Sequence, residues 1–224
     1  MTPKPWSHSA LEQFKNCPRS YHEHRIAKSV VEVKHPATLW GERVHKDFED
    51  MMRDGIALPL DVAIHEDYLL RLKAMPGTEM IEEQIAFNKK LQPCGYWDDD
   101  VWYRGVIDYG KIHIEAERAH LVDYKTGKMH QKLGQLYLFM LWTFARYPQV
   151  QVISAEYYWT QLRTTNGAEY PRSRIPEMWS MFVPDLRQYA EAFHTDIWQP
   201  RQSGLCKKHC AVKDCEFNGL GLRR

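Results

Sequence analysis

The sequence predicts an α/β fold in which a mixed central β-sheet is flanked by helices. Helical patterns open the chain, strand patterns fill its middle, and helix and strand then alternate before a cysteine-rich C-terminal segment. That order is typical of proteins built around one sheet with helices packed on it. Hydrophobic residues make up 44% of the 224 residues and charged residues 26%, as expected of a soluble globular protein.

Residues 1–75 are expected to form an N-terminal helical lobe. Ser9 and the glutamate three residues after it have capping-box spacing, and Pro18 interrupts the helix that they begin. Apolar residues at helical spacing predict two further helices, over residues 39–53 and about 61–74.

Residues 76–165 are expected to hold the sheet and one helix packed against it. The alternation of apolar residues predicts strands at residues 79–87, 101–110, 111–127 and 150–162. The stretch 133–148 is apolar on almost all sides, which predicts a deeply packed helix. An Asn-Gly pair at residues 166–167 predicts a turn.

Residues 166–224 are expected to contain a helix over 184–198, with Pro184 at its first position, and then the cysteine-rich segment. The chain has no internal repeat and no low-complexity tract, and its length suits one domain. We therefore assign residues 1–224 to a single domain.

The composition also limits the classes of partner and compartment. The net charge is only +1, so a nucleic-acid-binding surface would have to be local. No apolar run approaches the ~18 residues of a membrane span, and the N-terminus lacks the apolar core of a signal peptide. We expect a cytoplasmic protein without a membrane partner.

The stretch "VDYKTG" is the first candidate for chemistry. Asp123 and Lys125 are two residues apart in a predicted strand, so their side chains leave the same face. If the strands at 101–110 and 111–127 pair, Asp108 meets Asp123 at one end of the sheet. Two such carboxylates repel each other unless a cation neutralises them, and oxygen ligands favour Mg²⁺ or Mn²⁺.

The alternative for this stretch is an ordinary surface ion pair, because Asp-x-Lys alone is a weak pattern. Two features favour the metal site. Apolar strand residues precede Asp123, and the apolar helix that follows carries Gln135 near its start, where a polar side chain needs a polar partner. Lys125 would then orient an attacking water or offset charge on a phosphate.

The cysteines form a second candidate site. Three of the five crowd into the run "CKKHCAVKDC", with spacing C-x3-C-x4-C, and an odd number in a reducing compartment argues against disulfides. Three thiolates are one short of a closed metal site, and Cys17 could supply the fourth. The C-terminal members are Cys206, Cys210 and Cys215. We favour a [4Fe–4S] cluster; Zn²⁺ with His209 nearby, or reduced cysteines without metal, are the alternatives. Cys94 has no evident part in it.

Several motifs together resemble a known family. "GVID…VDYKTG…QLYLF", the upstream "GERVH" and the N-terminal "LEQFKNCPRSYHEH" resemble the RecB-like branch of the PD-(D/E)XK nuclease superfamily. The C-terminal cysteines resemble those of its iron–sulfur members, such as the CRISPR-associated RecB-like exonucleases and the nuclease domain of AddB. The resemblance covers nearly the whole chain and implies a restriction-endonuclease-like core.

The resemblance implies roles for individual residues. His45 would be a metal ligand, and so would Asp108, Asp123 and the backbone carbonyl of Tyr124. Lys125 would be the catalytic lysine, and Gln135 would match the Gln of the family's Gln-x-x-x-Tyr motif. The sequence departs from that motif because Phe139 stands where the tyrosine is usual. We therefore leave the tyrosine's role unassigned, although Tyr137 is nearby.

The resemblance also implies that Cys17, Cys206, Cys210 and Cys215 hold a structural [4Fe–4S] cluster, although the C-terminal spacing is not quite the usual one. The implied activity is that of a metal-dependent DNA nuclease, an exonuclease on DNA ends or single strands in recombination, repair or phage-type DNA metabolism. Recombination or replication proteins would be its protein partners.

Two alternatives remain open at this point: a non-catalytic DNA-binding or scaffold subunit, and a nuclease active only within a complex such as that of CRISPR spacer capture. The sequence indicates neither polarity, nor oligomeric state, nor the number of catalytic metal ions.

Overall fold

The computed structural model of the chain describes residues 4–30 and 34–220. It divides into two compact units, one of residues 34–179 and the other of residues 1–33 together with 180–224. Residues 34–75, which the sequence analysis groups with the N-terminal helices, lie in the same unit as the sheet.

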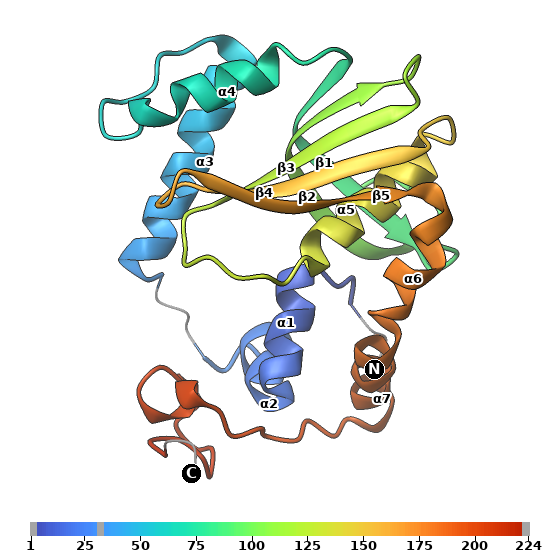
Figure 1. The fold of residues 1–224 in the computed structure, drawn as a ribbon. Helices are drawn as coiled ribbons and strands as arrows, with labels where there is room; N and C mark the ends of the chain where they lie inside the picture. The colour runs from blue at the N-terminus through green and yellow to red at the C-terminus, as the bar shows by residue number, and fades with distance from the viewer. Residues whose placement is uncertain (1–3, 31–33, 221–224) are drawn as a thin grey trace. The chain divides into compact units, whose positions relative to one another are not determined.

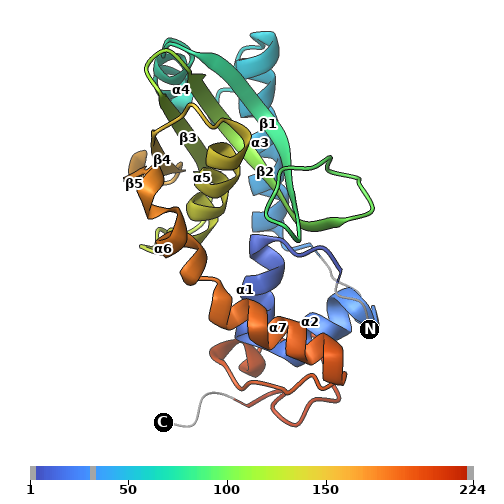
Figure 2. The same ribbon diagram turned by 90° about the vertical axis from the view of Figure 1, so that its right-hand side faces the viewer.

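A mixed five-stranded sheet forms the centre of the larger unit, in the order β1-β2-β3-β4-β5 (Figure 1). Its β3 and β4 are parallel and the other neighbours antiparallel. The strands are β1 (Thr78–Asn88), β2 (Val101–His113), β3 (Arg118–Lys125), β4 (Val152–Trp159) and β5 (Thr164–Pro171). Residues 89–100 form the long loop between β1 and β2, which extends beside β2 in Figure 2. The predicted fold class, a mixed sheet flanked by helices, is confirmed.

Helices cover both faces of this sheet. The helix α5 (Gly134–Arg146) connects the parallel strands β3 and β4, as a crossover helix does. Its residues 136–144 are all buried, in agreement with the predicted deep helix. The opposite face packs against α3 (Pro36–Asp54) and α4 (Glu66–Lys73), whose apolar side chains share one core cluster with strand side chains. That cluster includes Phe48, Leu69, Tyr109, Val122, Tyr124 and Tyr158.

A predicted strand boundary and a predicted turn are wrong. The strand predicted to end at residue 110 runs on to His113, and the turn lies at residues 114–117. A Cβ atom on Gly110 would lie 2.6 Å from Met80 Cε, so this glycine serves close packing. The Asn-Gly pair lies inside β5, and the turn before β5 is at residues 160–163, where Arg163 has a φ of 51°.

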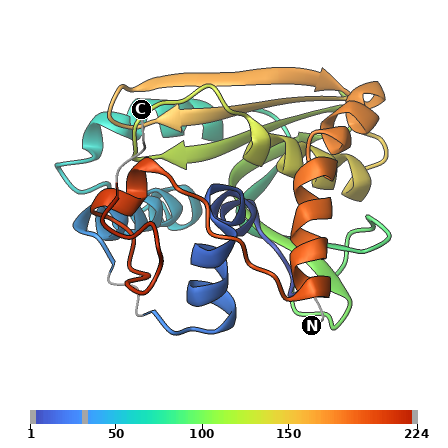
Figure 3. The same cartoon turned by 90° about the horizontal axis from the view of Figure 1, so that it is seen from below.

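The smaller unit combines an N-terminal and a C-terminal stretch of the chain, with the N-terminal helices beside the C-terminal segment (Figure 3). Its helices are α1 (His8–Asn16), α2 (Pro18–Tyr21), a π-helical turn (His22–Ile26) and α7 (Val183–Thr195). The cap of α1 is Ser7, whose Oγ accepts a hydrogen bond from Ala10 N at 3.2 Å, so the predicted cap at Ser9 is wrong. Pro18 separates α1 from α2 as predicted, and Pro184 lies in the first turn of α7.

Aromatic side chains form the core of this unit. Phe14 packs edge-on against Tyr21 and Tyr189, whose hydroxyl groups share a hydrogen bond of 2.6 Å. The short α6 (Ile175–Ser180), which the sequence analysis does not predict, precedes α7 in the chain. Among the residues that the structure describes, no helix has the length and apolar character needed to cross a bilayer.

The close approach at Gly167 gives a stability prediction. A Cβ atom there would lie 2.1 Å from the carbonyl oxygen of Ala155 on the neighbouring strand. We expect Gly167→Ala to lower the free energy of unfolding by about 1–3 kcal/mol, because a rigid backbone atom must move. Urea unfolding measures it, with Gly127→Ala as the control, since nothing lies within 4 Å of a Cβ atom at Gly127. Equal midpoints for the two variants would contradict the expectation.

Candidate functional site

Two carboxylates lie on adjacent strands at one end of the sheet. Tyr109 pairs with Val122 in the β2–β3 ladder, so Asp108 and Asp123 come next in register. Both side chains are buried. Asp108 Oδ2 accepts a hydrogen bond of 2.7 Å from the backbone N–H of Tyr124. The structure thus brings together the two acids that the sequence analysis singled out.

The helix α3 brings His45 to these acids. Its Nδ1 atom lies 3.4 Å from Asp108 Oδ2. Gly41, one turn earlier, lies inside the helix, and a Cβ atom on it would be 2.8 Å from Thr126 Oγ1. This glycine therefore allows a close approach of α3 to the loop after β3.

Glu82 on β1 is a third acid of the site, and the sequence analysis missed it. Ligand atoms of His45, Glu82 and Asp108 all lie within 4.8 Å of one another. In the β1–β2 pairing, Glu82 lies between Ile81, which pairs with Tyr109, and Glu83, which pairs with Ile107. Its φ is 50°, a backbone conformation that is rare for residues other than glycine. No spacing in the sequence indicates this contact, because it depends on the β1–β2 register and on that local kink.

Burial and neighbouring charges shift the pKa values of Glu82, Asp123 and His45. Burial, with the charge of Asp108 second, raises the pKa of Glu82 to about 7. Burial also raises the pKa of Asp123 to about 6, although the ammonium of Lys125 opposes the rise. Burial disfavours a charged His45, but its hydrogen bond with Asp108 and the neighbouring negative charges outweigh burial and raise its pKa to about 9.

The raised pKa of His45 determines the pH range in which its charge stabilises the fold of the metal-free protein. Protonated His45 contributes stability that is fully present below its ordinary pKa of 6.5. That contribution is lost as the pH rises through about 9, because the folded state then loses a proton that its carboxylates had stabilised. The site therefore favours bound positive charge.

Lys125 is held in place by three neighbours. Its Nζ atom lies 2.5 Å from Asp123 Oδ2 and 2.8 Å from Gln135 Oε1. The same atom stands 5.1 Å from the centre of the Tyr157 ring, from the neighbouring strand β4. Gln135, the polar residue at the start of the apolar α5, thus accepts a hydrogen bond from the Lys125 ammonium group. Tyr157 was not singled out, because an aromatic residue in a strand looks like any core residue.

The two aromatic residues of α5 near the missing motif position lie elsewhere. Phe139 is fully buried, and the Tyr137 hydroxyl lies 3.0 Å from that of Tyr170 on β5. The ring of Tyr124 packs against Phe48 and His45 in the core. Its backbone carbonyl as a metal ligand stays a prediction.

The donor set fits a hard divalent cation. An imidazole nitrogen of His45 and one carboxylate oxygen each of Glu82 and Asp108 lie within one ion's reach, and such sets suit Mg²⁺ or Mn²⁺. Within the described ranges, Lys125 and His45 are the basic groups that lie next to Asp108 and Asp123. A bound cation would offset the repulsion between these acids.

The cysteines gather around a separate cavity in the smaller unit. Its volume is about 420 Å³, and it is lined by Cys17, Cys206, Cys210 and Cys215, with His209 beside them. Cys17 Sγ accepts backbone hydrogen bonds of 3.4 Å from Ser20 and from Arg201. Cys206 Sγ accepts one of 3.3 Å from Ser203. Donors of this kind stabilise negative charge on sulfur. Cys94 lies in the loop between β1 and β2.

Comparison with known proteins adds a fold likeness. No protein-family model and no curated protein sequence matches the chain. A solved structure from Eubacterium rectale, named a "putative exonuclease", is similar to it with a TM-score of 0.53 and 12% identity, covering 98% of this chain and 89% of that one. A structure named SSO0001 gives a TM-score of 0.47 and 13% identity, with coverage of 97% and 89%. At these identities the first likeness extends to the fold.

Proposed function

We propose that the protein is a divalent-metal-dependent DNA nuclease of the RecB-like PD-(D/E)XK type. The observation that carries this proposal is the convergence of His45, Glu82 and Asp108 beside the Asp123–Lys125 pair. The proposed substrate is DNA, cut as an exonuclease cuts ends or single strands. The similar fold of the structure named a "putative exonuclease" agrees with this proposal.

The proposed ligands of the cation are His45, Asp108, Asp123 and, in addition to the sequence-based set, Glu82. Bound there, Mg²⁺ or Mn²⁺ would lower the pKa of water and stabilise negative charge on a phosphate. The chain's own residues fix the geometry: Asp108 is oriented by the Tyr124 N–H, and His45 is presented by the close approach at Gly41.

Lys125 is the proposed catalytic lysine. Among the described residues, its ammonium has two oxygen partners, Asp123 and Gln135, so one of its three N–H donors remains for a ligand. That donor can reach a water molecule or a phosphate oxygen while the other two hold the side chain still. Gln135 is accordingly a positioning residue, and so is Tyr157 beneath the ammonium.

Nuclease assays on the purified chain test the proposal. We expect Mn²⁺-dependent cleavage of 5′- or 3′-labelled DNA, single- or double-stranded. Asp108→Asn should lower kcat/KM at least about 100-fold, because a charge that stabilises the transition state through the cation is lost. Asp99→Asn, at an exposed acid in the β1–β2 loop, is the matched control.

Two outcomes would contradict the proposal. One is the absence of cleavage by the wild-type chain, which would favour a DNA-binding or scaffold subunit. The other is cleavage that Asp108→Asn leaves intact, which would point to a contaminating nuclease. Cleavage that appears only after partner proteins are added would assign the activity to a complex.

We further propose that Cys17, Cys206, Cys210 and Cys215 hold a [4Fe–4S] cluster. In a zinc site, thiolates at the usual bond length lie about 4 Å apart. Among the described residues, no three ligand atoms of these cysteines and His209 lie within 4.8 Å of one another, so they do not form a preassembled zinc site. The cluster would have a structural role, joining the two ends of the chain within the smaller unit.

Anaerobic purification tests the cluster. We expect a brown protein with stoichiometric iron and acid-labile sulfide, and loss of both from Cys17→Ala, because three thiolates leave the cluster incomplete. Cys94→Ala, at the cysteine outside the cavity, should keep its iron. A colourless protein with stoichiometric zinc would show that the cluster assignment is wrong.

A further inference from the structure

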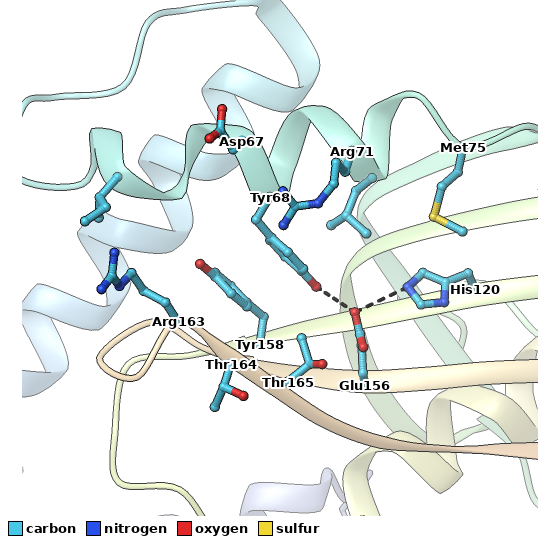
Figure 4. Close-up of a pocket in the computed structure, with 12 residues that line it drawn as sticks. Asp67, Tyr68, Arg71, Met75, His120, Glu156, Tyr158, Arg163, Thr164 and Thr165 are labelled. Carbon is cyan, nitrogen blue, oxygen red and sulfur yellow. Dashed lines mark hydrogen bonds and ion pairs between the residues drawn. The ribbon is translucent and has the colours of Figure 1, made fainter.

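A cavity of about 720 Å³ lies between α4 and the strands β3, β4 and β5 (Figure 4). The strand residues that line it point to the face of the sheet that α3 and α4 cover. Side chains alternate along a strand, so His120 and Glu156 point away from the face that carries Asp123 and Tyr157. The nuclease proposal uses none of the residues that line this cavity.

The floor of the cavity is a network of hydrogen-bonded side chains. The rings of Tyr68 and Tyr158 stack with centroids 3.7 Å apart and planes within 11° of parallel. The Tyr68 hydroxyl donates a hydrogen bond of 2.8 Å to Glu156 Oε1, and His120 Nε2 lies 3.6 Å from the same oxygen (Figure 4). The carboxylate is therefore already partnered, and the floor is preformed.

Two arginines stand over this floor without acid partners. Arg71 comes from α4, with its guanidinium 5.9 Å from the centre of the Tyr68 ring, and Arg163 comes from the turn before β5. Both are close enough to Tyr158 for their charges to act on its hydroxyl. Within the described part of the chain, neither guanidinium has a carboxylate oxygen within 4.0 Å. Both arginines line the same cavity on either side of the stacked tyrosine rings, and guanidinium groups favour an anion there (Figure 4).

The other residues that line the cavity indicate which kind of organic group would carry the anion. Thr164 and Thr165 add hydroxyl groups, Ile64, Leu72 and Met75 add apolar surface, and Asp67 on α4 adds one carboxylate. The volume is that of a site for a small organic molecule, larger than a bare anion requires. Guanidinium groups bind phosphate oxygens through paired N–H donors.

We propose that this cavity is a binding site for a phosphate monoester of nucleotide size, with the phosphate between Arg71 and Arg163. The organic part lies along the apolar side of α4, near Leu72 and Met75. Nucleoside monophosphates are the phosphate monoesters that an exonuclease releases, so the choice of dAMP as the first probe rests on the proposed function. The site itself does not depend on it.

Isothermal titration of the full-length protein with dAMP, in EDTA, tests the site without a contribution from the metal centre. We expect saturable binding of dAMP and none of adenosine, which lacks the phosphate. Arg71→Gln and Arg163→Gln should each weaken binding about tenfold, since each removes a charged hydrogen bond. Arg146→Gln is the matched control, because Arg146 is also exposed and also stands over a tyrosine ring, at 5.5 Å.

Failure of this proposal is distinct from failure of the nuclease proposal. Asp108→Asn should bind dAMP as the wild type does, whatever its activity. Binding of ribose 5-phosphate or inorganic phosphate with the same dependence on both arginines supports a phosphate site and identifies its source as a free metabolite. Binding only of a 5′-phosphorylated oligonucleotide would overturn the small-ligand assignment. Absence of dAMP binding, equal binding of adenosine, or indifference to both arginine variants would overturn the site.

Discussion

The crowding of three acids at the buried end of the sheet is the constraint on which the rest of the site depends. The charge of Asp108 helps to raise the pKa values of both Glu82 and Asp123, and the charge of Asp123 adds to the rise at Glu82. Carboxylates in a poorly solvated place repel one another and favour protonation. The chain offsets part of this with the Tyr124 N–H, the ammonium of Lys125 and a protonated His45.

The surrounding fold makes that crowding possible. Burial of aromatic residues between α3, α4 and the sheet fixes the position of the helix that carries His45. The left-handed backbone at Glu82 costs of the order of 1–3 kcal/mol, and such strain persists where packing over-determines it. The apolar α5 is buried on nearly every side, which fixes Gln135 and hence the ammonium of Lys125. Core packing thus supplies the free energy that holds like charges together.

Much of the architecture could be predicted from local patterns, because those patterns report burial. The apolar stretch of α5 and the Asp-x-Lys spacing on β3 each indicated an element or a contact directly. Turns were less predictable, since glycine serves both turns and close packing, and Gly110 and Gly167 do the latter. Sequence alone does not distinguish the two uses, which depend on what the neighbouring strand presents.

The site residues that the sequence did not indicate were missed for one physical reason. Glu82 enters the site through strand register and a local kink, and Tyr157 through the parallel pairing of β4 with β3. The cavity under α4 combines residues from three strands and a helix, none of which forms a motif. Contacts that depend on tertiary structure alone do not correspond to a fixed spacing of residues in the sequence, so sequence patterns do not predict them.

The most direct test of the metal site is the proton count on binding Mn²⁺. His45 must lose a proton to offer its nitrogen to a cation, and its pKa is raised to about 9. At about pH 8 the account predicts release of close to one proton per Mn²⁺ bound, and almost none from His45→Gln. Measured heats in buffers of different ionisation enthalpy give this number. Tight Mn²⁺ binding without proton release, or no binding at all, would contradict a cation shared by this histidine and these acids.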